Sequence, residues 1–111
     1  MSQKSLSKEI FSFSQKNVDA AFATAKTHIS LYGIKVLKGA PHSEQRHATF
    51  LLVPTRKIKR AVDRNRLKRR IKSIIYEQQL FKKDVASYII LLYPKALEYS
   101  FEEIRRFLMK V

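Results

Sequence analysis

The amino-acid sequence predicts a small α+β sandwich with elements in the order helix, strands, basic helix, strand, helix. Three observations indicate this class. Apolar residues recur at helical spacing in three segments, and short runs rich in Ile, Leu and Val lie between them. The chain has 111 residues, the length of one domain, and we expect residues 14–111 to form it. An apolar content of 45%, with 7 Phe and 5 Tyr, distinguishes it from a disordered basic tail.

The amino-terminal segment, residues 1–13, is expected to be loosely ordered because Ser, Lys and Gln dominate it. Phe11 and Phe13 are its candidate anchors. Ser14 is a suitable N-cap for a first helix over about Gln15–Lys26. The apolar residues on one face of that helix would be Val18, Ala21, Phe22 and Ala25.

Two β segments are expected next. The stretch over about His28–Leu37 is rich in Ile, Leu, Tyr and Val, and the turn residues of Lys38–Pro41 end it. A second strand is expected over His47–Val53, and Pro54 ends it because proline cannot donate to a strand ladder.

The basic helix is expected over about Arg60–Gln79, where neither Gly nor Pro interrupts the chain. Ala61 and Val62 extend its apolar character towards the amino-terminal end. Its main apolar residues have the spacing of one buried stripe, and they are Leu67, Ile71, Ile74 and Ile75. We therefore expect this helix to pack on a core by one face and to expose its cations on the other.

The last two elements are a strand and a helix. Val85–Tyr93 is an almost continuous apolar run, which is typical of a strand covered on both faces. Ser100 and Glu103 have the spacing of a capping box, so a helix should begin at Phe101. Its apolar stripe would be Phe101, Ile104, Phe107, Leu108 and Val111.

The positive charge is concentrated in one region. The chain has 23 Lys and Arg against 9 Asp and Glu, a formal net charge of +14. Ten of the 23 cations lie between Arg56 and Lys72, where Asp63 is the one acidic residue. Like charges one turn apart destabilise an isolated helix by about 0.2–0.5 kcal/mol per pair, so we expect phosphates to neutralise them. The alternative is a basic face that is merely solvated.

The sequence shows no constellation for catalysis. With no Cys there are no disulfides and no thiolate nucleophiles or ligands, and two Gly in all exclude glycine-rich phosphate loops. His28, His42 and His47 are not in metal-ligand spacing, and we interpret them as ordinary histidines. Glu102 and Glu103 diverge by about 100° on a helix and are interpreted as helix-start charges. We therefore expect no covalent chemistry from the protein alone and no metal site.

Aromatic side chains are a second candidate for contact with nucleic acid. Phe22, Tyr32 and Phe50 could stack on unpaired bases. For each of them the alternative is packing in the core.

A ten-residue motif suggests a family. Residues Arg60–Arg69, with the sequence Arg-Ala-Val-Asp-Arg-Asn-Arg-Leu-Lys-Arg, resemble the Ala-Val-x-Arg-Asn-Arg-x-Lys-Arg signature of the bacterial ribonuclease P protein subunit. The order and size of the expected elements resemble that family along nearly the whole chain. The chain departs from the pattern at Lys59, where a Gly is frequent, and at Ser87, where an Asp usually opens the strand. Tyr93 replaces the basic residue at the end of that strand, unless Lys95 serves in its place.

The resemblance implies a fold and a function. The fold would be ribonuclease P protein-like, of the type of domain 2 of ribosomal protein S5, with a left-handed crossover between parallel strands. The partner RNA would be the catalyst and would use Mg²⁺, held mainly by that RNA and the substrate, to remove the 5′ leader of precursor tRNA. The protein would be a monomer in a 1:1 ribonucleoprotein. Its charge would reduce the repulsion between the two RNAs.

The resemblance also implies site residues. The leader would lie in a cleft between the first helix and the sheet, with Val18, Phe22, Tyr32 and Ile34 as its candidates. Asn65 would hydrogen-bond RNA or orient the loop, and the alternative is that it caps or stabilises the local helix. The residues expected to bind RNA are Arg56, Lys57, Lys59, Arg60, Arg64, Asn65, Arg66, Lys68, Arg69, Arg70 and Lys72.

Other functions remain open at this point. A ribosomal protein or general RNA chaperone would have the same size, charge and aromatic content. A binder of double-stranded DNA is disfavoured because no helix-turn-helix or zipper seam is evident. A membrane-surface helix is disfavoured because the core needs the apolar face of residues 67–75. No apolar run is long enough to span a bilayer and no signal core is present, so we expect a cytoplasmic location.

Overall fold

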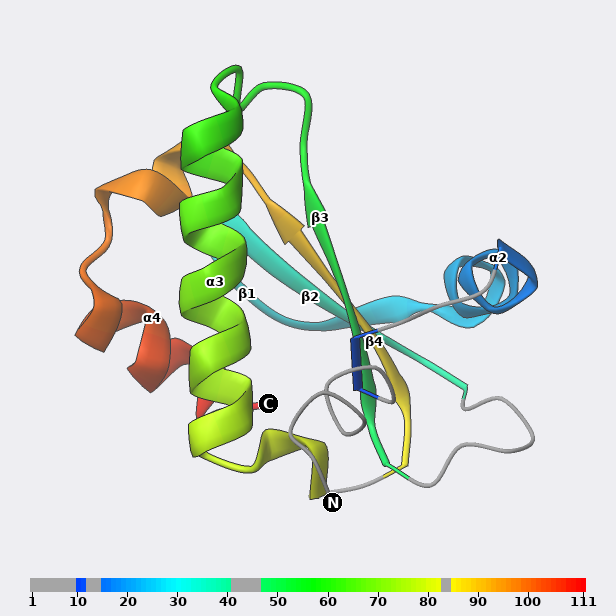
Figure 1. The fold of residues 1–111 in the computed structure, drawn as a ribbon. Helices are drawn as coiled ribbons and strands as arrows, with labels where there is room; N and C mark the ends of the chain where they lie inside the picture. Colours follow the sequence, from blue (N-terminus) through cyan, green and yellow to red (C-terminus); the bar gives the residue numbers. More distant parts are fainter. Residues whose placement is uncertain (1–9, 12–14, 41–46, 83–84) are drawn as a thin grey trace.

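The computed structural model describes residues 10–11, 15–40, 47–82 and 85–111, and for residues 15–18 and 20 it describes the backbone alone. These residues form a four-stranded sheet with α2 on one face and α3 and α4 on the other (Figure 1). The predicted α+β class is confirmed. The predicted N-cap at Ser14, the anchor Phe13 and the loop residue His42 lie outside the described residues.

The sheet combines antiparallel and parallel pairing. Its strands are β1 (Lys26–Leu31), β2 (Ile34–Gly39), β3 (Thr49–Pro54) and β4 (Ser87–Leu92), in the spatial order β1-β2-β4-β3. The central strand β4 runs antiparallel to β2 and parallel to β3. Parallel neighbours need a crossover connection, and α3 supplies it. The left-handed sense of this crossover stays a prediction.

A β-hairpin corrects the prediction of one β stretch over His28–Leu37. The chain turns at Tyr32 and Gly33, so that β1 and β2 pair antiparallel. Gly33 has a φ of 97°, a conformation that residues with a Cβ rarely adopt. A Cβ at Gly33 would also lie 2.7 Å from the backbone nitrogen of Ala96. The glycine therefore allows both the turn and its close contact with the segment after β4.

In the described part of the chain, three helices cover the sheet. They are α2 (Gln15–Thr24), α3 (Ala61–Glu77) and α4 (Phe101–Leu108), and two short 3₁₀ helices, η1 (Leu80–Lys82) and η2 (Pro94–Glu98), flank β4 along the chain. The predicted stripe of α3 is confirmed, because Leu67, Ile71, Ile74 and Ile75 are all buried. In α4 the prediction fails at Phe101, whose side chain is 38% exposed, while Ile104, Phe107 and Leu108 are buried.

The core lies mainly between the sheet and the layer of α3 and α4. In β4, every residue except Leu91 is buried, which confirms a strand covered on both faces. Phe50 is 1% exposed and its ring stacks on Tyr88 at 5.0 Å, so core packing is confirmed for this residue and base stacking is excluded. Ile10 is fully buried and Phe11 packs against the core, so the amino-terminal segment contributes to it.

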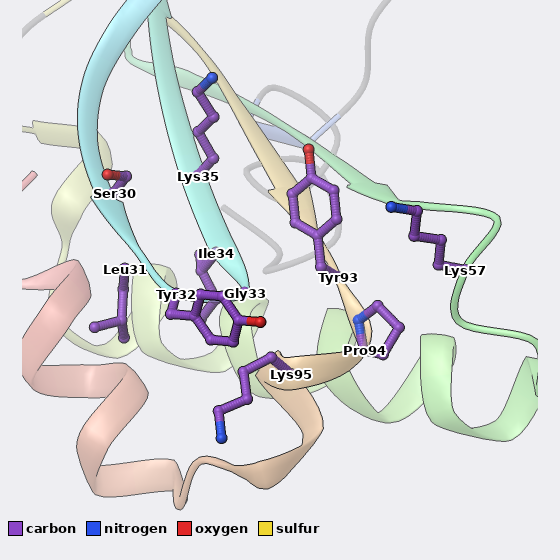
Figure 2. A pocket seen from close by; sticks show the side chains of 10 residues that line it. All are labelled: Ser30, Leu31, Tyr32, Gly33, Ile34, Lys35, Lys57, Tyr93, Pro94 and Lys95. Atoms are coloured by element: carbon purple, nitrogen blue, oxygen red, sulfur yellow. The ribbon is translucent and has the colours of Figure 1, made fainter.

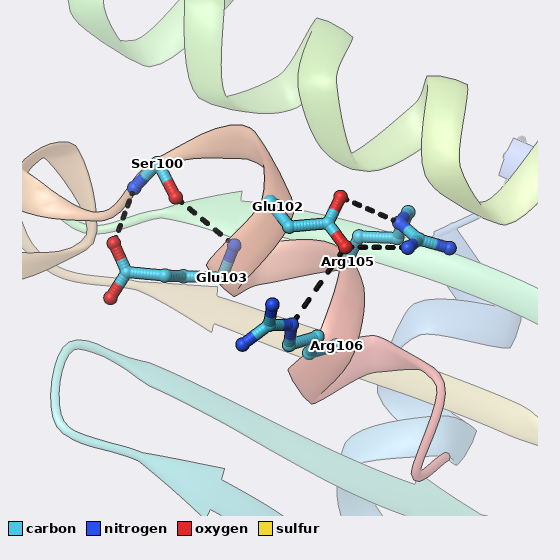
Figure 3. A network of polar contacts seen from close by, with 5 residues as sticks. All are labelled: Ser100, Glu102, Glu103, Arg105 and Arg106. Carbon is cyan, nitrogen blue, oxygen red and sulfur yellow. Dashed lines mark hydrogen bonds and ion pairs between the residues drawn. The ribbon is translucent and has the colours of Figure 1, made fainter.

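A capping box begins α4 as predicted (Figure 3). The Ser100 side chain accepts a hydrogen bond from the Glu103 backbone N–H at 3.2 Å. The Ser100 backbone N–H donates to the Glu103 carboxylate at 3.0 Å and holds the pKa of that carboxyl below its ordinary value. Glu102 pairs with Arg105 and Arg106 on the same helix, and the hydrogen bond from Arg105 lowers the pKa of Glu102. Both acids therefore serve the helix start.

Replacing Ser100 with Ala is expected to lower the free energy of unfolding by about 1 kcal/mol, because the first turn of α4 loses its cap. The Glu103 pKa is lower in the folded than in the unfolded chain. Its contribution is therefore present above the unfolded pKa and is lost as the pH falls through the folded pKa. Urea unfolding at neutral pH measures the change. Ser73→Ala, at an exposed hydroxyl within α3, is the control, and an equal loss in both variants would contradict the capping role.

Candidate nucleic-acid interface

A short loop connects β3 to α3 and exposes four cations. The Thr55 backbone N–H donates to the Leu92 carbonyl at 2.8 Å, and the side chain of Ile58 is 2% exposed. These two residues attach the loop to the sheet and the core. The cationic side chains around them are exposed, and they belong to Arg56, Lys57, Lys59 and Arg60.

Arg64, in the first turns of α3, faces back to this loop. One nitrogen of its guanidinium, Nη1, donates to the Ile58 carbonyl at 2.8 Å and to the Lys59 carbonyl at 3.1 Å. Beside it lies a hollow of about 460 Å³ lined by Pro54, Thr55, Arg56, Lys59 and Arg64. We call this the loop hollow. Three cationic side chains thus converge on a recess large enough for a phosphate group.

A second basic recess lies along one flank of α3. It has a volume of about 620 Å³ and is lined by Val62, Asn65, Lys68, Arg69 and Lys72, which we call the flank hollow. These residues recur at three- and four-residue intervals, so they share one side of the helix. The side chains of Asn65 and Arg69 are exposed, and so is that of Arg66 beside them. Arg60, not Asn65, is the N-cap of the helix.

Some of the predicted RNA-binding cations have intramolecular partners. Arg60 lies 4.0 Å from the Asp63 carboxylate, one turn along the helix. The Lys72 ammonium lies over the Phe11 ring at 5.3 Å. Surface pairs of this kind contribute little stability, so both cations can exchange partners with a phosphate. The structure thus places predicted residues of the loop and α3 at two recesses, the loop hollow and the flank hollow, and leaves Arg70 partly buried.

A third recess lies at the end of the sheet, beside the β1–β2 turn (Figure 2). We call it the sheet-end hollow. It has a volume of about 620 Å³, and its polar and aromatic lining includes Tyr32, Lys35, Lys57, Tyr93 and Lys95. Figure 2 shows Lys35 and Tyr93 projecting from the same side of the sheet. Its three lysines can meet phosphates, and its two tyrosines offer ring faces to bases.

Tyr32, at the hairpin turn, has its backbone fixed by a hydrogen bond. Its backbone carbonyl accepts a hydrogen bond from the Tyr99 hydroxyl at 2.6 Å, while its side chain is 77% exposed. The Lys95 ammonium lies 5.9 Å from the centre of the Tyr32 ring. The ring is therefore presented to solvent on a fixed backbone, which lowers the entropy cost of stacking on a base.

Of the four residues predicted for the leader cleft, Tyr32 and Ile34 line the sheet-end hollow, while Val18 and Phe22 lie on α2 and do not line it. Phe22, 46% exposed, lies on α2, whose carboxyl end is joined to the far end of β2 through a hydrogen bond from Ala40 to Thr24. Tyr32 lies beyond the other end of β2, and six strand residues span about 20 Å. Val18 lies on α2, but its side chain is outside the described atoms.

Ile34 lies at the sheet-end hollow, but its side chain is fully buried in the core. Its predicted contact with the leader stays a prediction. Side chains alternate between the two faces of a strand, so the next residue, Lys35, faces the opposite side and lines the recess with its charge. Sequence reasoning missed Lys35 as a site residue, together with Tyr93 and Lys95. The alternation of apolar Ile34, charged Lys35 and apolar Val36 was the signal that could have found Lys35.

The histidines and carboxylates of the described part of the chain form no cluster of three that could hold a metal ion. His28 lies against the Tyr88 ring and His47 against the Phe81 ring, which agrees with ordinary histidines. None of the helices in the described ranges combines the length and hydrophobicity needed to cross a bilayer.

Comparisons with known proteins agree with this geometry. The ribonuclease P family model matches residues 14–111. The fold is similar to that of a Staphylococcus aureus RNase P protein mutant with defective mRNA degradation activity, at a TM-score of 0.80 and 17% identity over 98% of this chain and 90% of that one. It is also similar to the RNase P protein from Thermotoga maritima, at a TM-score of 0.72 and 19% identity over 86% of this chain and 88% of that one. No curated protein sequence matches the chain.

Proposed function

Because the chain belongs to the ribonuclease P family, we propose that it is the protein subunit of ribonuclease P and assists removal of the 5′ leader from precursor tRNA. The observation that carries the proposal is the family match over residues 14–111. The basic motif helix lies within that range and is exposed on its charged side. The size and charge that favoured a ribosomal protein are equally compatible with this narrower assignment.

The surface of the β3–α3 loop and α3 is proposed to dock on the catalytic RNA. The loop hollow and the flank hollow both border α3, and each is lined by two or more Lys or Arg side chains. Guanidinium groups match phosphate oxygens in pairs, and binding several phosphates releases condensed counterions. The repulsion among cations that weakens the free helix is relieved in such a complex.

The exposed face of the sheet is proposed to hold the single-stranded leader. The path would run from Phe22 on α2, across the sheet, to Tyr93, Lys95 and Lys57 at the sheet-end hollow. That span of about 20 Å fits several nucleotides of an extended strand. The wide separation of Phe22 and Tyr32 is compatible with this path, because an extended strand would contact both residues. Lys95 supplies the cation that the family places at the end of this strand.

Catalysis is proposed to belong to the RNA. The described histidines and carboxylates form no cluster of three that could hold a metal ion. In this proposal Mg²⁺ would be held mainly by the catalytic RNA and the substrate, in contact with phosphate oxygens. The protein would act as a monomer in a 1:1 complex with that RNA in the cytoplasm, where its cations reduce repulsion between catalyst and substrate.

A cleavage assay tests the proposal. The purified protein is added to a bacterial ribonuclease P RNA and a leader-bearing precursor tRNA at low Mg²⁺ and moderate salt. We expect faster release of the 5′ leader than with the RNA alone. The absence of stimulation with a cognate RNA would refute the assignment, and cleavage by the protein without RNA would refute the division of labour.

The leader path makes a finer prediction. Tyr93→Ala with Lys95→Ala should weaken binding of leader-bearing precursor roughly tenfold while leaving mature tRNA almost unchanged, since a stacked base and a phosphate contact are lost. The control is Lys82→Ala. Lys82 is exposed and lies before the start of β4, whereas Lys95 lies after the end of that strand. The test measures the affinities of the holoenzyme for the leader-bearing precursor and for mature tRNA. An equal loss for both would place the leader elsewhere.

A further inference from the structure

The two arginines of the Arg64-Asn65-Arg66 motif have different surroundings. Arg64 donates from one guanidinium nitrogen to two backbone carbonyls of the preceding loop, those of Ile58 and Lys59, at 2.8 and 3.1 Å. Arg66 is exposed. Residues two apart on a helix lie about 200° from each other around its axis. The side chains of Arg64 and Arg66 therefore project from nearly opposite sides of α3.

The loop that Arg64 holds contributes cations to two recesses. Lys57 lines the sheet-end hollow at one side of the loop, and Arg56 and Lys59 line the loop hollow at the other. The loop is attached at its start by the Thr55 backbone bond to Leu92 and in its middle by the buried Ile58 side chain. Arg64 adds the attachment at its end, immediately before α3 begins.

We propose that Arg64 is a positioning residue that holds the β3–α3 loop so that Lys57 faces the sheet-end hollow. The proposal rests on the proposed function in that the ligand of this hollow is the leader strand. Both carbonyls accept from one guanidinium nitrogen, Nη1, and the shorter side chain of a lysine would leave its ammonium farther from them. Without these bonds the loop backbone is free to move. Binding of RNA must then also bear the entropy cost of ordering Lys57.

Charge-conserving variants test this inference. In Arg64→Lys we expect the Ile58 backbone amide, which donates to the Thr55 carbonyl, to exchange its hydrogen about tenfold faster in the free protein. The preference of the holoenzyme for leader-bearing over leaderless tRNA should fall severalfold, with the salt dependence of binding unchanged because the charge is kept. The matched control is Arg66→Lys, which should leave the exchange of the loop as in the wild type.

A double-mutant cycle distinguishes positioning from a general loss of stability. If Arg64 acts through Lys57, then Lys57→Ala and Lys57→Ala with Arg64→Lys should show the same leader preference. Fully additive losses, or unchanged loop exchange in Arg64→Lys, would overturn the inference. A wild-type holoenzyme without any leader preference would instead refute the proposed leader site, while the exchange experiment would still decide whether Arg64 holds the loop.

Discussion

Replacing Arg66 and Arg69 with alanine is expected to weaken binding to ribonuclease P RNA about 10- to 100-fold. The slope of log affinity against log salt should also become shallower by about 2. Both side chains are exposed on α3, and Arg69 lines the flank hollow beside Asn65. Each lost phosphate contact removes one charge-assisted interaction and one released counterion. Filter binding or anisotropy over a series of salt concentrations measures both quantities.

The control for this prediction removes the same charge elsewhere. Lys82→Ala with Lys110→Ala takes away two exposed cations outside the basic surface of the loop and α3. We expect a far smaller loss of affinity from that variant. Equal losses in the two double variants would mean that total charge, and not the α3 surface, determines RNA binding.

Replacing Ile71 with alanine is expected to lower the free energy of unfolding by about 2–5 kcal/mol, a large share of the roughly 5–15 kcal/mol of a small domain. Ile71 is fully buried in the middle of α3, where the helix meets the core. The truncation removes buried apolar surface and leaves a cavity. Denaturant unfolding measures the change, and RNA binding should weaken at temperatures where the variant begins to unfold.

Val62→Ala provides the comparison within the same helix. Val62 is 47% exposed in the first turn, so its truncation should change stability by less than about 0.5 kcal/mol. A similar cost at both positions would contradict the assignment of a buried stripe and an exposed flank.

Local patterns predicted the helical elements well. The four apolar residues of the α3 stripe are buried, and Ser100 and Glu103 form the capping box that their spacing indicates. Both patterns depend on interactions within a few residues of the chain. The same holds for the signature between Arg60 and Arg69, which pointed to the family that the match over residues 14–111 shows.

The sheet was predicted less well because its geometry depends on distant partners. The turn at Gly33 divides what looked like one strand, and it is held against η2 by a hydrogen bond from the Tyr93 backbone N–H to the Gly33 carbonyl at 2.9 Å. A partner 60 residues away cannot be seen in a local pattern. The burial of the Ile34 side chain was missed for the same reason, since the face of a strand residue follows from its register with its neighbours.

The sequence by itself determined where the positive charge is concentrated and the helix that carries it, because charge density and helical spacing are local properties of the chain. Only the tertiary structure decided how the cations are arranged in space. It turned Arg64 back to the carbonyls of Ile58 and Lys59. It also gathered Lys35, Lys57 and Lys95, from three separate segments, around one recess at the end of the sheet. The physical reason is that strand pairing and the crossover through α3 bring together residues whose neighbours in space are remote along the chain.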